Sequence, residues 1–181
     1  CLFEKLIDDP QELDWFLANV VTPEWHFQHD AGRPIAEMVP ERIEQFPKYG
    51  SLINAYATRF NETIPGPVDF SLELVERLAA NNVPLFGITN FGAEFWDQFR
   101  PTAPIFDHFR DIVVSGAEKL VKPDRAIYEL AIERFNKQPE KCLFVDDRLE
   151  NIEASERIDI VGHHFKDAPT LEKHLQALEL L

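Results

Sequence analysis

The sequence predicts an α/β protein in which an all-helical lobe precedes a parallel-sheet core. Apolar residues in the first 65 positions recur at helical spacing, and the segment Ile64-Pro65-Gly66-Pro67 is the strongest break in the chain. After this break, short apolar segments alternate with helical segments of about 10 residues. Such alternation is typical of a parallel sheet with crossover connections. We therefore expect a helical domain over residues 1–65 and an α/β core over residues 66–181.

Four segments of the first lobe are expected to be helical. Residues 11–21 place their apolar side chains on one side at helical spacing. Thr22 followed by Pro23 predicts the cap and the first turn of a second helix. Pro34 opens a third helix that we expect to end at Pro40, and residues 52–60 form the fourth.

The core is expected to alternate strands and helices. Strands are predicted over residues 84–89, 111–115 and 141–145, and a fourth is predicted to start at residues 158–161. Helices are predicted over residues 70–81, 94–99, 125–135, 150–157 and 170–180.

Composition limits the partners and the compartment. Lys plus Arg is 18 and Asp plus Glu is 32, so the formal net charge is 18 − 32 = −14. This balance argues against nucleic-acid and anionic-membrane partners, which need a basic surface. No apolar run reaches the roughly 20 residues of a membrane span. Cys1 and Cys142 offer no disulfide framework, so we expect a cytoplasmic protein. The composition leaves both a monomer and a homodimer open.

Polar side chains gather where the predicted strands end. The first strand ends in Thr89-Asn90, the second leads to Lys122-Pro123-Asp124, and the third ends in Asp146-Asp147 with Asn151 four residues further on. Ligands of open α/β sheets bind beyond these carboxyl ends. Paired carboxylates suit Mg²⁺, whereas hydroxyl, amide and ammonium groups suit a phosphoryl dianion. Each motif alone also fits a strand-end turn, a solvated lysine or a helix cap.

These motifs, in this order, resemble those of the haloacid dehalogenase-like (HAD) hydrolase superfamily. The second, third and fourth motifs of that family are matched by residues 86–90, by Lys122-Pro123-Asp124 and by residues 143–151. The segment from Asp111 to Tyr128 resembles the corresponding segment in a subfamily of small-molecule phosphatases and 2-haloacid dehalogenase-like proteins. The resemblance implies a Rossmann-like three-layer core with a helical-bundle cap, here residues 1–65.

The resemblance also implies roles for single residues. Thr89 and Asn90 would bind phosphoryl oxygens, and Lys122 would hold the nucleophile and the phosphoryl charge. Asp147 would ligate the Mg²⁺ cofactor, with Asp146 and Asn151 ligating or supporting it. The substrate would be a small phosphate ester, such as a sugar phosphate, hydrolysed through an aspartyl-phosphate.

The first motif of the family, an apolar strand ending in the nucleophilic aspartate, has no match in this sequence. Asp8 and Asp9 are adjacent, whereas the motif has one residue between its two acidic positions. Two of the five residues 3–7 are charged, which is unlike a buried strand. We expect that roughly 15–25 residues lie upstream of Cys1, enough for a strand, a loop and a helix start. The chain without them is expected to be inactive.

Three other functions compete with a phosphatase. A 2-haloacid dehalogenase needs no metal, so the pair Asp146-Asp147 disfavours it. A phosphoacceptor receiver domain has its paired aspartates first in the chain, whereas here they follow Thr89 and Lys122. A catalytically inactive protein that binds a ligand or a partner is supported only by the unmatched first motif.

Substrate choice is expected to lie in the cap. Trp25, His26, His29, Asp30 and Arg33 cluster at a helix–loop boundary similar to the specificity segment of the family. The alternative is structural, because Trp25 can pack in a core and residues 30–34 can form a turn. His163 and His164 make a poor metal chelate, since adjacent strand residues face opposite sides.

Overall fold

The computed structural model describes all 181 residues, which form two compact units that are described separately. The first unit contains residues 1–66, 90–103 and 114–119. The second contains residues 67–89, 104–113 and 120–181. Two segments that the sequence analysis assigned to the core, 90–103 and 114–119, therefore group with the helical residues. The division into a cap of residues 1–65 and a core of residues 66–181 stays a prediction.

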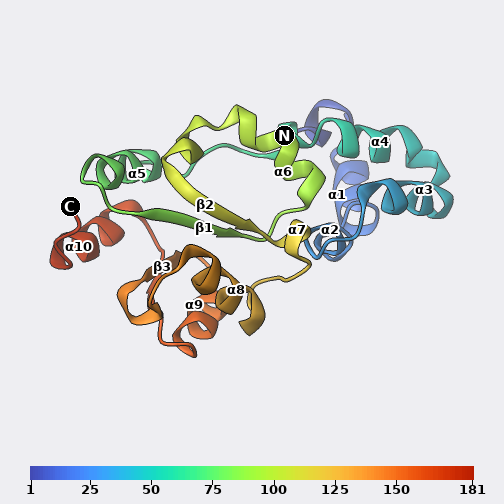
Figure 1. The fold of residues 1–181 in the computed structure, drawn as a ribbon. Helices are drawn as coiled ribbons and strands as arrows, with labels where there is room; N and C mark the ends of the chain where they lie inside the picture. Colours follow the sequence, from blue (N-terminus) through green and yellow to red (C-terminus); the bar gives the residue numbers. More distant parts are fainter. The chain divides into compact units, whose positions relative to one another are not determined.

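The first unit is helical. Its helices are α1 (Pro10–Asn19), α2 (Pro23–Asp30), α3 (Ile35–Gln45), α4 (Gly50–Thr58), α6 (Ala93–Phe99) and the short α7 (Ser115–Glu118) (Figure 1). Asp9 caps α1 by accepting a hydrogen bond from the Gln11 amide at 2.9 Å. Thr22 caps α2 by accepting one from the Trp25 amide at 3.2 Å, so the predicted cap is confirmed.

An apolar cluster rich in aromatic rings holds the first unit together. Met38, Ile53 and Phe95 are fully buried in it. Phe60 stacks on Phe95 with ring centroids 3.9 Å apart, and Tyr56 meets both rings edge-on. Burying one large apolar side chain contributes about 1.5–3 kcal/mol. The burial of Phe95 thus packs α6 against the helices of the first 66 residues, although α6 lies about 30 residues further along the chain.

Helix α3 runs past its predicted end. The sequence predicts a stop at Pro40, but the helix continues to Gln45. A proline removes one backbone donor and disfavours the preceding turn. Met38 and Ile43, on either side of Pro40, both pack in the apolar cluster. The packing of these two side chains therefore outweighs the tendency of Pro40 to end the helix.

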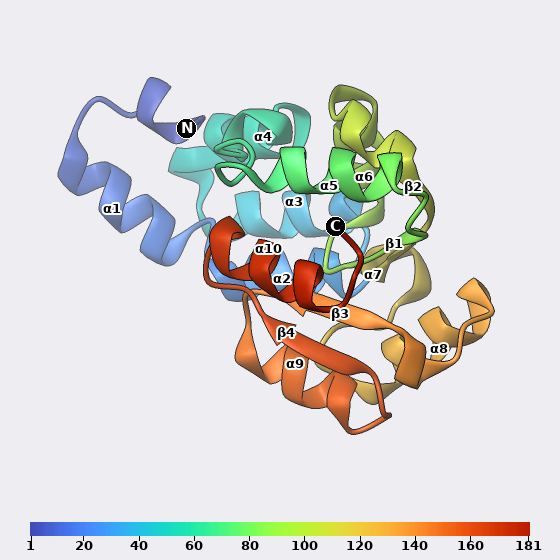
Figure 2. The same cartoon turned by 90° about the vertical axis from the view of Figure 1, so that its left-hand side faces the viewer.

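The second unit alternates strands and helices. Its strands are β1 (Leu85–Thr89), β2 (Phe109–Val114, with Val114 itself in the first unit), β3 (Leu143–Asp146) and β4 (Val161–His164). Its helices are α5 (Ser71–Ala80), α8 (Arg125–Phe135), α9 (Leu149–Glu156) and α10 (Ala168–Ala177). β3 and β4 run parallel, with Leu143 opposite Val161 and Asp146 opposite His164 (Figure 2). The predicted α/β class is confirmed.

The strands form two separate two-stranded sheets, β1–β2 and β3–β4. β1 and β3 are therefore each paired on one side. All the residues of β1 are only half-buried, and Val145 of β3 is 36% exposed. Inner strands of a covered parallel sheet are normally buried on both faces. β1 and β3 thus have the exposure of edge strands.

The fourth strand begins later than predicted. Residues 158–160 form the turn that ends α9, in which the Ile160 amide donates to the Ser155 carbonyl at 3.3 Å. Asp159 adopts the left-handed conformation, with φ at 66°. Ile158 and Ile160 are both buried, so their apolar character serves the packing of this turn. The predicted strand start at Ile158 was therefore wrong.

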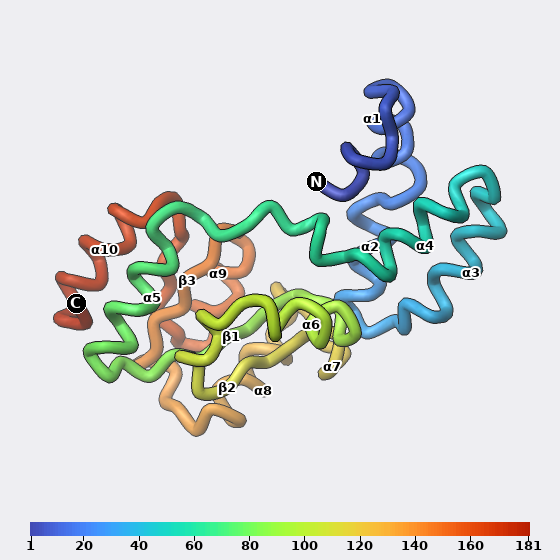
Figure 3. Tube along the Cα trace, turned by 90° about the horizontal axis from the view of Figure 1, so that it is seen from above, coloured from blue at the N-terminus to red at the C-terminus, as the bar shows by residue number.

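Helices α5 and α10 lie side by side in the second unit (Figure 3). Arg77 of α5 donates to Glu172 of α10 at 2.7 Å, and the Asn81 side chain donates to the Leu180 carbonyl at 3.2 Å. These contacts join the last helix to the first helix of this unit. None of the helices in the structure combines the length and the apolarity that crossing a bilayer requires.

Candidate active site

A buried ion pair marks the carboxyl end of β3. The Lys122 ammonium donates to Asp146 Oδ2 at 2.7 Å, and the two side chains are only 11% and 6% exposed. Lys122 Nζ also lies 5.6 Å from the centre of the Phe144 ring. The strand places Asp146 at its last residue, and the segment after α7 brings in Lys122. Two residues 24 positions apart thus meet at one strand tip.

The other oxygen of Asp146 is held by the start of α9. Asp146 Oδ1 accepts hydrogen bonds from the Arg148 amide and from Asn151 Nδ2, both at 2.9 Å. Burial of Asp146 opposes its ionisation, but the Lys122 hydrogen bond and charge, with these two donors, hold its pKa below the ordinary value. Asp146 is therefore an ionised carboxylate in a rigid frame.

Tyr128 fixes the backbone at Asn151, one of the residues that bind Asp146. Its side chain is fully buried, and its hydroxyl donates to the Asn151 carbonyl at 3.0 Å. Burial, then the charge of Asp146, raises the pKa of Tyr128, so the phenol stays neutral. Tyr128 was not among the site residues predicted from the sequence. The apolar spacing of α8 places Ile127 inward, and Tyr128 joins the same core cluster.

The predicted phosphate and metal residues are placed as follows. Direct contacts join Lys122, Asp146 and Asn151. Asp147, the next residue, is exposed, and its backbone carbonyl accepts a hydrogen bond from His164 Nε2 at 3.0 Å. Thr89 is the half-buried last residue of β1, and Asn90 begins a segment of the first unit. The roles of all these residues in binding phosphate or metal stay predictions.

Asp147 has the chemistry of a metal ligand, whereas Asp146 is already engaged. No group of three or more His, Cys, Asp or Glu side chains in the structure is arranged to hold a metal ion. Mg²⁺ commonly uses only one or two protein carboxylates and keeps several waters. The exposed carboxylate of Asp147, beside the fixed carboxylate of Asp146, therefore fits Mg²⁺ better than a metal that needs a full protein cage.

The predicted specificity residues belong to the first unit. Trp25 is 6% exposed and packs against Tyr56, with ring centroids 5.4 Å apart. Arg33 donates to Gln28 at 2.7 Å and pairs with Glu41. These two side chains are thus engaged in packing and in surface contacts.

His26 and Asp30, in contrast, form a polar cluster with Tyr56, in which Asp30 and Tyr56 are buried and His26 is half-buried. The Tyr56 hydroxyl contacts His26 Nδ1, and His26 Nε2 lies 3.4 Å from Asp30 Oδ2. Burial, then the neighbouring His29, lowers the pKa of His26 to about 4. Burial raises the pKa of Asp30 to about 6, although His29 and the Gly92 amide oppose that rise. Asp30 Oδ1 and His29 Nε2 are buried without a hydrogen-bond partner.

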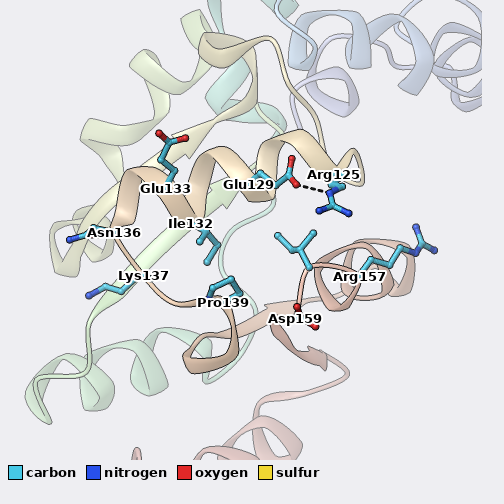
Figure 4. Close-up of a pocket in the computed structure, with 10 residues that line it drawn as sticks. Arg125, Glu129, Ile132, Glu133, Asn136, Lys137, Pro139, Arg157 and Asp159 are labelled. Atoms are coloured by element: carbon cyan, nitrogen blue, oxygen red, sulfur yellow. Dashed lines mark hydrogen bonds and ion pairs between the residues drawn. The ribbon is translucent and has the colours of Figure 1, made fainter.

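A surface pocket of about 480 Å³ lies between α8 and the turn after α9 (Figure 4). Arg125 and Glu129, one turn apart on α8, pair at 2.6 Å at one end of it. None of Lys122, Asp146 and Asn151 lines it. Its charged side chains are evenly divided between the two signs: Arg125, Lys137, Arg157, Glu129, Glu133 and Asp159. This balance gives a phosphate dianion no net attraction, so the strand tips stay the candidate site.

Comparison with known proteins assigns the family. A profile described as haloacid dehalogenase-like hydrolase matches residues 25–159, which is most of the chain. The chain therefore belongs to the haloacid dehalogenase-like hydrolase family, and the resemblance found in the sequence is confirmed.

Two curated proteins are similar to this chain. Sesquiterpene phosphatase astK of Aspergillus oryzae is 32% identical over 95 residues, which cover 52% of this chain and 48% of that protein. Acyl-CoA dehydrogenase family member 10 of Mus musculus is 26% identical over 166 residues, which cover 90% of this chain and 14% of that protein. The chain thus spans about half the length of the first and a small part of the second.

Solved structures share the fold. A magnesium complex of a HAD family enzyme from Bacteroides thetaiotaomicron aligns with a TM-score of 0.70 at 19% identity, covering 83% of this chain and 79% of that chain. A predicted HAD-like family hydrolase from Porphyromonas gingivalis aligns with a TM-score of 0.69 at 15% identity, covering 88% and 82%. At these identities the likeness concerns the fold.

Proposed function

We propose that the chain forms most of a Mg²⁺-dependent phosphomonoester phosphatase that acts on a small phosphorylated metabolite, with sugar phosphates among the candidates. The observation that carries this proposal is the buried contact of Lys122 with Asp146 at the tip of β3, directly before the exposed Asp147. A fixed ammonium and, next in sequence to its carboxylate partner, an exposed carboxylate suit a phosphoryl group held between a lysine and a metal ion. The likeness to a sesquiterpene phosphatase supports phosphoester chemistry.

Asp147 would be the main protein ligand of Mg²⁺, supported by Asp146 and Asn151. When bound, Mg²⁺ would neutralise charge on the phosphoryl oxygens. The crystal structure of the Bacteroides enzyme with magnesium and inorganic phosphate, which aligns here with a TM-score of 0.66, supports this cofactor. Asn151 acts on the site through Asp146, because its amide donates to that carboxylate at 2.9 Å.

The other site residues would bind and orient the ester. Lys122 would neutralise the negative charge of the phosphoryl group. The Thr89 hydroxyl and the Asn90 amide would donate hydrogen bonds to the phosphoryl oxygens. An aspartate outside residues 1–181 would form a bond from its carboxylate oxygen to phosphorus as the ester P–O bond breaks and the leaving alcohol takes a proton. Water would then hydrolyse this aspartyl-phosphate to release inorganic phosphate and the carboxylate.

The strand that carries this aspartate would pair with both β1 and β3. Support comes from the sheets, since β1 and β3 are each paired on one side and have the exposure of edge strands. A strand between them would satisfy their unpaired backbone groups, each of which costs about 1–3 kcal/mol when buried. It would also end beside Asp146 and Lys122.

Two alternatives can be distinguished from a Mg²⁺-dependent phosphatase by experiment. A 2-haloacid dehalogenase would need no metal, and a binding protein would bind its ligand without hydrolysing it. We expect the chain alone to bind Mg²⁺ and inorganic phosphate without hydrolysing esters. A fusion that adds an apolar strand ending in Asp before Cys1 should hydrolyse p-nitrophenyl phosphate only with Mg²⁺. Metal-independent chloride release from 2-chloropropionate would favour the dehalogenase. Phosphate binding without turnover by the fusion would favour the binding protein.

Two variants with matched controls test the residues. Asp147→Asn should weaken Mg²⁺ binding measured by calorimetry, while Asp69→Asn, another exposed aspartate, should not. In the fusion, Lys122→Ala should lower the rate by about 10²–10³, the usual loss for one electrostatic donor. Lys141→Ala, at an exposed lysine, should leave the rate unchanged. Unchanged Mg²⁺ binding in Asp147→Asn would refute the metal assignment.

A further inference from the structure

Three backbone segments of the first unit meet in close contact around Ser115. They are the end of α2 at residues 29–32, the loop at residues 90–92 and the start of α7 at residues 115–116. We call this the three-segment junction. Ser115 is fully buried within it.

The Ser115 hydroxyl joins all three segments. It accepts a hydrogen bond from the Phe91 amide at 2.9 Å and donates one to the Asp30 carbonyl at 2.6 Å. The next residue, Gly116, donates its amide to the Phe91 carbonyl at 3.0 Å. Both backbone groups of Phe91 are therefore bound to residues 115–116. Because the Phe91 nitrogen belongs to the peptide that follows Asn90, these bonds orient the backbone of Asn90 as well.

Glycines allow the backbones to approach this closely. A Cβ on Gly116 would lie 2.5 Å from the Ala93 nitrogen, and a Cβ on Gly92 would lie 2.0 Å from Cδ2 of His29. His29 is itself held, with Nδ1 2.8 Å from the Arg33 carbonyl. No larger residue fits at either glycine unless the junction opens, so the loop has little freedom to shift.

We propose that Ser115 is a positioning residue of the phosphoryl-binding loop, orienting the Asn90–Phe91 peptide and tying it to the end of α2. This inference rests on the proposed function, in which Asn90 donates to a phosphoryl oxygen. It adds that one hydroxyl sets the orientation of Asn90. It also couples that loop to the helix that carries His26 and Asp30, two of the predicted specificity residues.

Calorimetric titration of the chain with inorganic phosphate in the presence of Mg²⁺ tests the proposal. Ser115→Ala should weaken phosphate binding about tenfold, the effect of one lost buried hydrogen bond. Ser155→Ala is a matched control, because Ser155 is also fully buried and its hydroxyl donates to the Ile152 carbonyl at 2.8 Å within α9. The control should lose stability and keep its phosphate affinity. Equal affinity of Ser115→Ala and wild type would overturn the proposal.

A second variant and a second measurement separate positioning from folding. Ser115→Cys keeps the size of the side chain but hydrogen-bonds poorly, so its phosphate affinity should fall between those of wild type and Ser115→Ala. Hydrogen exchange of the Phe91 amide should speed up in both variants. If Ser115→Ala does not fold, wild-type affinity in Ser115→Cys overturns the proposal. If the wild-type chain binds no phosphate, the proposed function itself fails; equal binding by wild type and variants refutes only the role of Ser115.

Discussion

The contact of half-buried His26 with buried Asp30 predicts two opposite dependences of stability on pH. Burial raises the pKa of Asp30 from 3.8 to about 6 and lowers that of His26 from 6.5 to about 4. Each of these two changes in pKa corresponds to a free energy of about 3 kcal/mol. Asp30 therefore contributes stability that is present below pH 4 and is lost as the pH rises through 6. His26 contributes the reverse, since stability is lost as the pH falls from 6.5 towards 4.

In the wild-type chain, the contributions of Asp30 and His26 to the pH dependence of stability oppose each other. Replacing one residue at a time should reveal the contribution of each. In Asp30→Asn only the His26 contribution remains, so the stability of the variant relative to wild type should fall by about 2–3 kcal/mol between pH 7 and pH 4. In His26→Asn the relative stability should rise by a similar amount. His29, which is buried, and Glu94, 3.6 Å from His29 Nε2, face the same cluster and stay unchanged in both variants.

Urea unfolding followed by circular dichroism at several pH values measures these differences. Comparison with wild type at each pH removes the contribution of all other titrating groups. The expected result is a pair of curves of relative stability against pH that have opposite slopes between pH 4 and pH 7. Parallel behaviour of both variants and wild type would refute the reasoning, because it would mean that neither group titrates abnormally in the folded chain.

Further predictions concern the ion pair and a glycine. Lys122→Met leaves the Asp146 carboxylate buried without its ammonium, so we expect a loss of about 3–5 kcal/mol in unfolding free energy at pH 7. Adding Asp146→Asn should restore part of it, and an unaltered unfolding midpoint in the single variant would contradict the prediction. Gly92→Ala should cost about 1–3 kcal/mol or more, since its Cβ would lie 2.0 Å from the His29 ring. Gly50→Ala, whose Cβ would lie 3.4 Å from Ile43, is the control and should change the melting temperature little.

Local patterns predicted the helices and strands where each segment has a single dominant signal. Helix α8 spans the predicted residues 125–135 because its apolar spacing agrees with its packing. Pro40 and Ile158 were misjudged because long-range burial decided both positions. A proline is tolerated where the residues before and after it in a helix pack in the apolar cluster, as Met38 and Ile43 do. An apolar segment can serve a turn as well as a strand.

Residue types at the strand ends, in their order along the chain, identified the family and predicted most of the residues of the candidate site. The residue types follow from chemistry, because phosphate and Mg²⁺ suit hydroxyl, ammonium and carboxylate groups, whereas the order along the chain is particular to the family. Tertiary structure decided what no local pattern encodes. It paired Lys122 with Asp146, placed Tyr128 under Asn151 and used Ser115 to join three segments that are distant in sequence. These contacts depend on distances between segments 23 to 85 residues apart, and such distances are set by the packing of the whole unit.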